Sequence, residues 1–118
     1  MSDLIERYLA VWNEADPEAR RAKLAQDWAE DVTLVDPLVD VQGRDAIDAT
    51  IAGVREQFDG LVFTPVGTVD AHHGVARFRW GLGPAGAEPL AIGFDVVTLD
   101  AEGRIKTVVG FFDKLPAT

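Results

Sequence analysis

The first half of the chain contains several stretches in which apolar residues recur at helical spacing. The first stretch has an apolar residue every three or four positions and predicts an amphipathic helix; its stripe consists of Leu4, Ile5, Tyr8, Leu9, Val11 and Trp12. Another helix is predicted from about Asp45 to Phe58, and its stripe consists of Ile47, Ile51, Val54 and Phe58.

A second helix is predicted between these two. Asp16-Pro17-Glu18 has the composition of a helix start, with aspartate as the N-cap, proline at the first helical position and an acid in the first turn. We expect the helix to run to about Trp28. Its expected buried residues are Ala22, Leu24, Ala25 and Trp28, and its expected solvated residues are Arg20, Arg21 and Lys23.

The rest of the chain predicts strands. Residues 32–35 form a short β-rich run, and Asp36-Pro37 ends it because proline cannot donate to a strand ladder. The later β-rich runs cover residues 62–69, 75–82, 90–99 and 105–115, with turn-forming segments between them. Helices followed by long strands predict one α+β domain over residues 1–118, in which three helices pack on one face of a mainly antiparallel sheet. Glycines at 67, 81, 93 and 110 would let this sheet bend around a pocket.

Charge and cysteine content narrow the function classes. The 118 residues include 20 Asp and Glu against 11 Lys and Arg, for a formal net charge of −9. Such a surface repels phosphate backbones and anionic lipid headgroups, so we expect neither nucleic-acid binding nor membrane binding. The chain contains no cysteine and no apolar run of the roughly 20 residues that a membrane span needs. We expect a cytoplasmic protein.

Asp95 lies in the middle of an apolar strand. Neither face of residues 90–99 is otherwise polar, so this strand is expected to be buried on both sides. A buried carboxylate is costly unless it is paired or neutralised by a raised pKa. Asp95 is therefore either a structural aspartate with hydrogen-bonding partners or a functional carboxyl group that lines a pocket.

Asp36 and Tyr8 are further candidates, each with a plain structural alternative. Asp36 stands where a strand gives way to a loop, a position where turn-forming aspartates are common, and Asp40 is a second acid four residues later. Tyr8 is the only tyrosine and belongs to an apolar helix stripe, where its hydroxyl group needs a partner.

Aromatic residues supply candidate pocket walls. Phe78 and Trp80 share one face of their strand, whereas Arg77 and Arg79 share the opposite face. The candidate substrate-binding residues are Trp12, Phe78, Trp80 and Phe112. His72 and His73 fall in a turn without further metal ligands nearby, and the chain has no nucleotide-binding, zincin or hydrolase motif, so no metal or cofactor is expected.

Three segments carry a family resemblance: Arg7-Tyr8-Leu9-Ala10-Val11-Trp12-Asn13, Val32-Thr33-Leu34-Val35-Asp36-Pro37 and Gly93-Phe94-Asp95. Together they resemble the nuclear-transport-factor-2-like (NTF2-like) superfamily, in its SnoaL-like or polyketide cyclase-like group. The resemblance covers essentially the whole chain. It implies a cystatin-like cone with a strongly curved sheet, and a homodimer formed through the outer sheet face.

Within that group, the residues are most similar to the ketosteroid isomerase pattern. The resemblance implies that Asp36 is a general base and that Tyr8 and a protonated Asp95 donate to an oxyanion. It points to a cofactor-free isomerase or cyclase that acts on an apolar carbonyl compound. The alternative is a non-catalytic protein of the same fold that binds a hydrophobic small molecule.

Overall fold

The computed structural model describes residues 2–116 and contains three helices and six strands over that range. The helices are α1 (Ser2–Asn13), α2 (Pro17–Asp27) and α3 (Arg44–Gln57). The strands are β1 (Trp28–Val35), β2 (Asp40–Gln42), β3 (Val62–His72), β4 (Val75–Gly83), β5 (Ala91–Leu99) and β6 (Ile105–Lys114).

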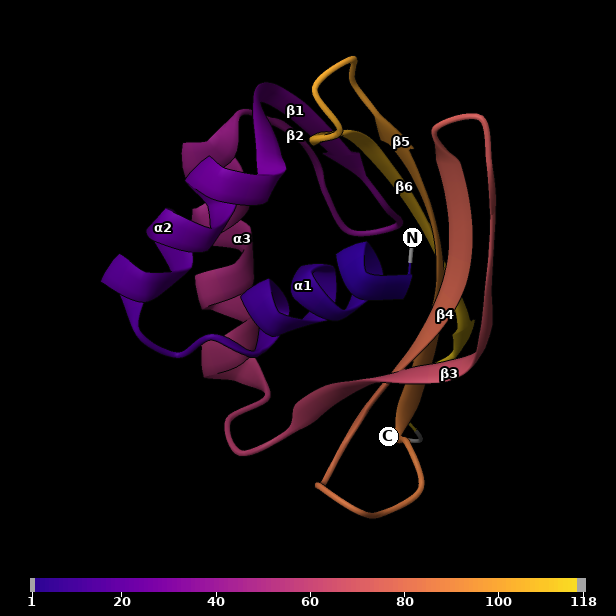
Figure 1. Cartoon of the computed structure of the whole chain (residues 1–118). Helices are drawn as coiled ribbons and strands as arrows, with labels where there is room; N and C mark the ends of the chain where they lie inside the picture. Colours follow the sequence, from indigo (N-terminus) through magenta and orange to yellow (C-terminus); the bar gives the residue numbers. More distant parts are fainter. Residues whose placement is uncertain (1, 117–118) are drawn as a thin grey trace.

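The six strands form one curved sheet in the order β2-β1-β6-β5-β4-β3. All neighbouring pairs are antiparallel except β1 and β6, which run parallel. Figure 1 shows the three helices gathered on the concave side of the sheet, with α1 between the sheet and α3. The expected α+β architecture is thus confirmed.

The stripe of α1 forms the centre of the core. All six of its apolar residues are buried, and Tyr8 is only 2% exposed. They pack between the sheet and the other helices, so burial of this face accounts for the position of α1. No helix within residues 2–116 has the length and apolar character needed to cross a membrane.

The second helix differs from the prediction at its end and on its polar face. Asp16 caps it as expected, its Oδ2 accepting from the backbone N–H of Ala19 at 3.0 Å. The helix stops at Asp27, and Trp28 is instead the first, fully buried residue of β1. A lone aromatic residue between a helix and a strand fits the periodicity of either element. The sequence pattern therefore placed Trp28 in the wrong one.

Arg20 is buried, not solvated as the sequence pattern suggests. The residue as a whole is 3% exposed, and its side chain is held by Asp48 of α3, with 2.6 Å between Nε and Oδ1. Another guanidinium N–H donates to the carbonyl oxygen of Glu14 at 2.9 Å. Ala22 and Ala25, which were expected inside, are exposed. The ion pair between α2 and α3 therefore buries Arg20, while Arg21 of the same helix stays exposed.

The first strand is longer than predicted and has an additional partner. It begins at Trp28, and the three residues of β2 pair with its end, where Val35 faces Asp40. A three-residue strand is too short for a recognisable alternation, so the sequence predicted only a loop there. The hairpin between β1 and β2 positions Asp36 beside the sheet.

Strand β5 is buried on one face only, which corrects the expectation that both its faces lie inside. Ala91, Gly93, Asp95 and Val97 are buried, whereas Phe94 and the other residues of the opposite face are half-buried. On neighbouring β6, Val109 and Phe111 of that same outer face are exposed. The outer sheet face is therefore apolar and uncovered in the single chain.

Candidate functional site

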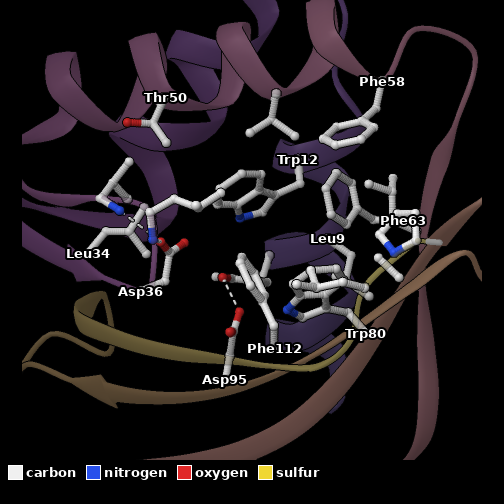
Figure 2. Close-up of a pocket in the computed structure, with 18 residues that line it drawn as sticks. Leu9, Trp12, Leu34, Asp36, Thr50, Phe58, Phe63, Trp80, Asp95 and Phe112 are labelled. Carbon is white, nitrogen blue, oxygen red and sulfur yellow. Dashed lines mark hydrogen bonds between the residues drawn. The ribbon is translucent and has the colours of Figure 1, made fainter. Parts of the chain in front are cut away.

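A pocket of about 140 Å³ lies between α1, α3 and the concave face of the sheet. Its walls are largely aromatic, and the aromatic residues other than Tyr8 are Trp12, Phe58, Phe63, Trp80 and Phe112. The side chains with polar groups at its surface, tryptophans aside, are those of Tyr8, Asp36, Thr50 and Asp95. No lysine or arginine lines the pocket within the described residues. Figure 2 shows Asp36 and Asp95 pointing into the same region, below Trp12.

Tyr8 and Asp95 are joined by a buried hydrogen bond. The hydroxyl group of Tyr8 donates to Oδ2 of Asp95 at 2.7 Å, which connects α1 to β5. Tyr8 is held in this orientation by aromatic neighbours: it stacks on Trp28 at 5.4 Å between ring centroids and meets the edge of Phe78 at 5.1 Å. The packing fixes the hydroxyl group at the floor of the pocket.

Burial changes the proton affinity of both groups. The pKa of Asp95 is raised to about 6, mainly by desolvation and also by the charge of Asp36, although interactions with the Tyr8 and Trp80 side chains lower it. The pKa of Tyr8 is raised well above its ordinary value, first by burial and then by the charge of Asp95. Asp95 therefore takes up its proton at a higher pH than an exposed aspartate does.

Asp36 is oriented by the backbone of its own loop. Its Oδ1 accepts from the N–H groups of Leu38 at 2.8 Å and Val39 at 3.0 Å, while its own N–H donates to the carbonyl oxygen of Val39. This is the turn that the Asp-Pro pair predicts. The turn also directs the carboxyl group into the pocket, so the structural and functional interpretations of Asp36 do not exclude each other.

Sheet register brings Asp36 and Asp95 together across Gly110. Asp95 faces Gly110 in the β5–β6 ladder, and Val35 faces Val109 in the β1–β6 ladder, so Asp36 follows on the other side of Gly110. A Cβ atom on residue 110 would lie 2.7 Å from Oδ1 of Asp95 and 3.2 Å from Cβ of Asp36. The missing side chain thus leaves the space in which the two acids approach each other.

A second glycine makes room for an aromatic wall. Gly93 lies between Trp80 and Phe112 in adjacent strands. A Cβ atom on Gly93 would fall 2.0 Å from the Trp80 ring, so the indole lies directly over the glycine. Trp80 also meets the edge of Phe112 at 6.3 Å between centroids. The glycines of the sheet therefore create space for side chains of the site.

The other residues singled out from the sequence take different places. Trp12, Trp80 and Phe112 line the pocket as expected. Phe78 does not; it lies behind Tyr8 and supports its ring. Asp40 is exposed on β2 and is not part of the pocket lining.

Several lining residues were not predicted as site residues, among them Leu9, Thr50, Phe58 and Phe63. Leu9 belonged to the predicted stripe of α1, but a stripe alone does not tell core from pocket wall. Phe63 is positioned by Asn13: the amide of Asn13 donates to the Phe63 carbonyl oxygen at 2.9 Å, and its Oδ1 accepts from the Phe63 N–H at 2.7 Å. The sequence signal for these two hydrogen bonds was Asn13 itself, a polar residue at the end of an apolar helix.

The described residues contain no cluster of three or more His, Cys, Asp or Glu side chains that could hold a metal ion. His72 and His73 are exposed at the β3–β4 turn and contact each other. The polar groups at the pocket are two carboxyl groups, a phenol, a threonine hydroxyl group and indole N–H groups.

Comparison with solved structures identifies related proteins over nearly the whole chain. A provisionally assigned isomerase of the SnoaL-like family from Agrobacterium tumefaciens is 44% identical, with a TM-score of 0.89 over 94% of this chain and 95% of that one. An NTF2-like protein of unknown function from an Exiguobacterium species is 21% identical, with a TM-score of 0.73 over 93% of this chain and 98% of that one.

A provisionally assigned polyketide cyclase from Sinorhizobium meliloti has a TM-score of 0.69 at 20% identity, over 92% of this chain and 93% of that one. The two more distant similarities show the fold. No curated protein matches the chain significantly. The model of the SnoaL-like domain matches residues 5–108, which include Tyr8, Asp36 and Asp95. The chain therefore belongs to the SnoaL-like family and has the NTF2-like fold.

Proposed function

We propose that this protein is a small-molecule enzyme that transfers a proton at the carbon next to a carbonyl group of an apolar substrate, as an isomerase or a cyclase. One observation carries the proposal: Asp36 and the Tyr8–Asp95 pair meet in one largely aromatic pocket. The relative from Agrobacterium tumefaciens, provisionally assigned as an isomerase, also supports an isomerase reaction.

In the proposed reaction, the Asp36 carboxylate removes a proton from the α-carbon, and the electrons of that C–H bond form an enolate. Tyr8 and protonated Asp95 stabilise the enolate oxygen by hydrogen bonds. An isomerase then completes the cycle when Asp36 returns the proton to another carbon of the conjugated system. In a cyclase, the enolate carbon instead attacks a second carbonyl group of the same substrate, whose oxygen then takes up a proton.

The protonation states set the expected pH dependence. Tyr8 donates to Asp95 while Asp95 is ionised, but a protonated Asp95 can donate and leave the Tyr8 O–H free for the substrate. Because the pKa of Asp95 is about 6, the fraction of free protein with this second donor falls as the pH rises above about 6. We therefore expect kcat/KM to decline through this range.

Solvent exchange tests the proposal without knowledge of the natural substrate. In D2O, the protein should incorporate deuterium next to the carbonyl group of simple ketones, which NMR detects. Asp36→Asn should slow this exchange roughly 100-fold or more, and Tyr8→Phe should slow it as well. Asp40→Asn is the matched control and should leave it unchanged. Wild-type protein that exchanges no ketone in a broad panel would contradict the proposed chemistry.

A second candidate function is non-catalytic binding of a hydrophobic small molecule. It is favoured by the hydrogen bond itself, since Tyr8 and Asp95 satisfy each other and neither needs a substrate. This function predicts that apolar ligands bind, that no deuterium is incorporated and that Asp36→Asn leaves ligand affinity unchanged. The same variants therefore separate the two functions.

We also propose that two chains associate through the outer sheet face. Val109 and Phe111 are exposed there, at 41% and 56%, beside the half-buried Phe94. Arg79 and Asp113 form an exposed ion pair on the same face, with 3.2 Å between Nε and Oδ2. Light scattering should give the mass of a dimer, and Phe111→Glu should give that of a monomer. A monomeric wild type at micromolar concentration would contradict the proposal.

A further inference from the structure

One buried donor at the pocket is left without an acceptor. The indole nitrogen of Trp12 is inaccessible to solvent and has no hydrogen-bond partner among the described residues, although the residue lines the pocket. Trp12 as a whole is only 8% exposed. Unpaired buried N–H groups are rare because desolvation without a hydrogen bond is costly, so this one indicates a missing acceptor. Trp28 has a similar unpaired nitrogen, but it does not line the pocket.

The unpaired N–H faces the proposed reaction centre. Figure 2 shows the nitrogen on the edge of the Trp12 ring that is turned toward Asp36 and Asp95. The side chain of Trp12 also lies close enough to the Tyr8 hydroxyl group to lower the pKa of that group, against the larger effect of burial. An acceptor atom between Trp12 and Tyr8 would therefore lie beside both carboxyl groups.

The two hydroxyl groups of the pocket already donate within the protein while Asp95 is ionised. The Tyr8 hydroxyl group donates to Asp95, and the Thr50 hydroxyl group donates to the carbonyl oxygen of Ala46 at 2.9 Å. Trp12 thus offers a donor that a ligand can use without breaking a hydrogen bond inside the protein.

The dimensions and charges of the pocket restrict the rest of the ligand. A cavity of roughly 150 Å³ lined by apolar side chains accommodates benzene, so the 140 Å³ here corresponds to about one six-membered ring. Beyond it, Leu38 and Leu115 are exposed at 77% and 61% and form the mouth. The two acids and the absence of a basic residue in the described lining disfavour an anionic ligand, and the apolar walls disfavour a charged one of either sign.

We propose that the substrate is a compact, neutral carbonyl compound with a single six-membered ring buried in the pocket, and that Trp12 donates a hydrogen bond to its oxygen. This inference rests on the proposed function, because it names the substrate class of the same site. The ring lies among Trp12, Phe63 and Trp80, and the carbon next to the carbonyl group faces Asp36. Further rings would extend past Leu38 into solvent.

The role of Trp12 is tested with two ligands of nearly the same shape, cyclohexanone and methylenecyclohexane, in which a CH2 group replaces the carbonyl oxygen. Trp12→Phe removes the N–H donor and keeps an aromatic ring. Its Kd for cyclohexanone should rise about fivefold to fifteenfold, the effect of one hydrogen bond, while its Kd for methylenecyclohexane changes less than about twofold. An equal loss of affinity for both ligands would mean that Trp12 acts only by packing, and would overturn the assignment.

A spectroscopic measurement covers the case in which Trp12→Phe does not fold. The chain has three tryptophans, so their indole N–H signals can be assigned by NMR. Saturating cyclohexanone should move the Trp12 signal downfield more than methylenecyclohexane does. The Trp28 signal is the internal control and should stay in place with both ligands. Equal shifts of the Trp12 signal with the two ligands would contradict the hydrogen bond.

Ligand size is tested with cyclohexanone, 2-decalone and a 3-oxosteroid. We expect affinity to gain less than about threefold from one ring to two and nothing more from four rings, because the added rings reach the exposed mouth. A 3-oxosteroid that binds a hundredfold tighter would overturn the size assignment but leave the proposed function intact, provided that Tyr8→Phe still weakens its binding. Absence of binding and of deuterium exchange with all three ketones would instead count against the proposed function.

Discussion

Gly110 leaves the space that the carboxyl group of Asp95 occupies, since a Cβ atom on residue 110 would lie 2.7 Å from Oδ1 of Asp95. The two residues face each other across β5 and β6, and Asp36 lies on the other side of the glycine. The candidate site therefore depends on a residue that has no side chain. This relationship leads to the first prediction.

Gly110→Ala should damage the site while the fold survives. The added methyl group must displace the Asp95 carboxyl group, which breaks the 2.7 Å hydrogen bond with Tyr8. We expect a loss of about 1–3 kcal/mol in the free energy of unfolding and at least a tenfold loss of ketone affinity. Urea unfolding and calorimetric titration would measure these two quantities.

Gly53→Ala is the matched control for that substitution. Gly53 lies on the exposed side of α3, and a Cβ atom there would meet nothing within 4 Å. Alanine favours a helix interior, so this variant should be about 0.5–1 kcal/mol more stable than wild type and bind ketones equally well. If Gly110→Ala behaved like this control, the proposed close approach of Asp95 would be refuted.

Asp95→Asn should stabilise the protein at high pH. Burial raises the pKa of Asp95 to about 6 from 3.8, so the folded state binds this proton more tightly than the unfolded chain does. The contribution of Asp95 to the free energy of unfolding therefore falls as the pH rises from about 4 to about 6. Above that range, the buried and ionised carboxylate destabilises the folded state by a constant amount. At pH 8, we expect the variant to be about 1–3 kcal/mol more stable than wild type.

Below pH 4 this difference should vanish, because Asp95 is then protonated in both folded and unfolded wild type. Comparison of the two proteins by thermal unfolding between pH 4 and pH 8 cancels the contributions of the other acids. Because the asparagine amide also donates hydrogen bonds, the variant should still exchange deuterium into ketones, and its rate should no longer fall as the pH rises above about 6. A stability difference that is independent of pH would contradict the raised pKa.

Asn13→Ala should loosen one wall of the pocket. Asn13 exchanges two hydrogen bonds with the backbone of Phe63, and without them the N–H and carbonyl groups of that residue lose their partner. We expect a loss of about 1–3 kcal/mol in unfolding free energy and faster amide exchange at Phe63. Asn13→Asp keeps the acceptor and loses the donor, so it should have an intermediate effect. Unchanged amide exchange at Phe63 in the alanine variant would show that the two hydrogen bonds from Asn13 are not needed to hold this wall.

Arg20→Ala should be far more destabilising than Arg21→Ala. Both arginines lie near Asp48, but the Arg20 side chain is 4% exposed and the Arg21 side chain 66%. Removal of Arg20 leaves the carboxylate of Asp48, with 14% of its side chain exposed, without its close partner, for which we expect a loss of roughly 3 kcal/mol. The exposed pair should contribute less than about 1 kcal/mol. Equal effects in urea unfolding would contradict this ranking.

Local pattern was sufficient for most elements. The apolar stripe of α1, the cap at Asp16 and the four long strands were predictable because periodicity and turn chemistry act over a few residues. The errors occurred where a residue far away in the sequence determines the local structure or the burial of a side chain. Trp28 joins β1 instead of α2, and Arg20 is buried because Asp48, 28 residues away, provides its ion pair.

The candidate site was predictable only in part. The sequence marked Asp95 because a carboxyl group in an apolar strand is costly, and the resemblance pointed to Tyr8 and Asp36. It could not separate Phe78, which supports Tyr8 from behind, from Trp80, which lines the pocket, because both lie on the same face of β4. Nor could it indicate the free N–H of Trp12, since an unpaired donor is defined by what surrounds it.

By itself, then, the sequence determined the helices, the long strands and the presence of a costly buried acid, all of which depend on neighbouring residues and on simple burial energetics. Only the tertiary structure decided that Asp36 and Asp95 meet across Gly110, that Tyr8 donates to Asp95, and that Trp12 keeps a free donor. The physical reason is strand register. A shift of one residue in the β5–β6 ladder would turn Asp95 to the outer face, and no local pattern fixes that register.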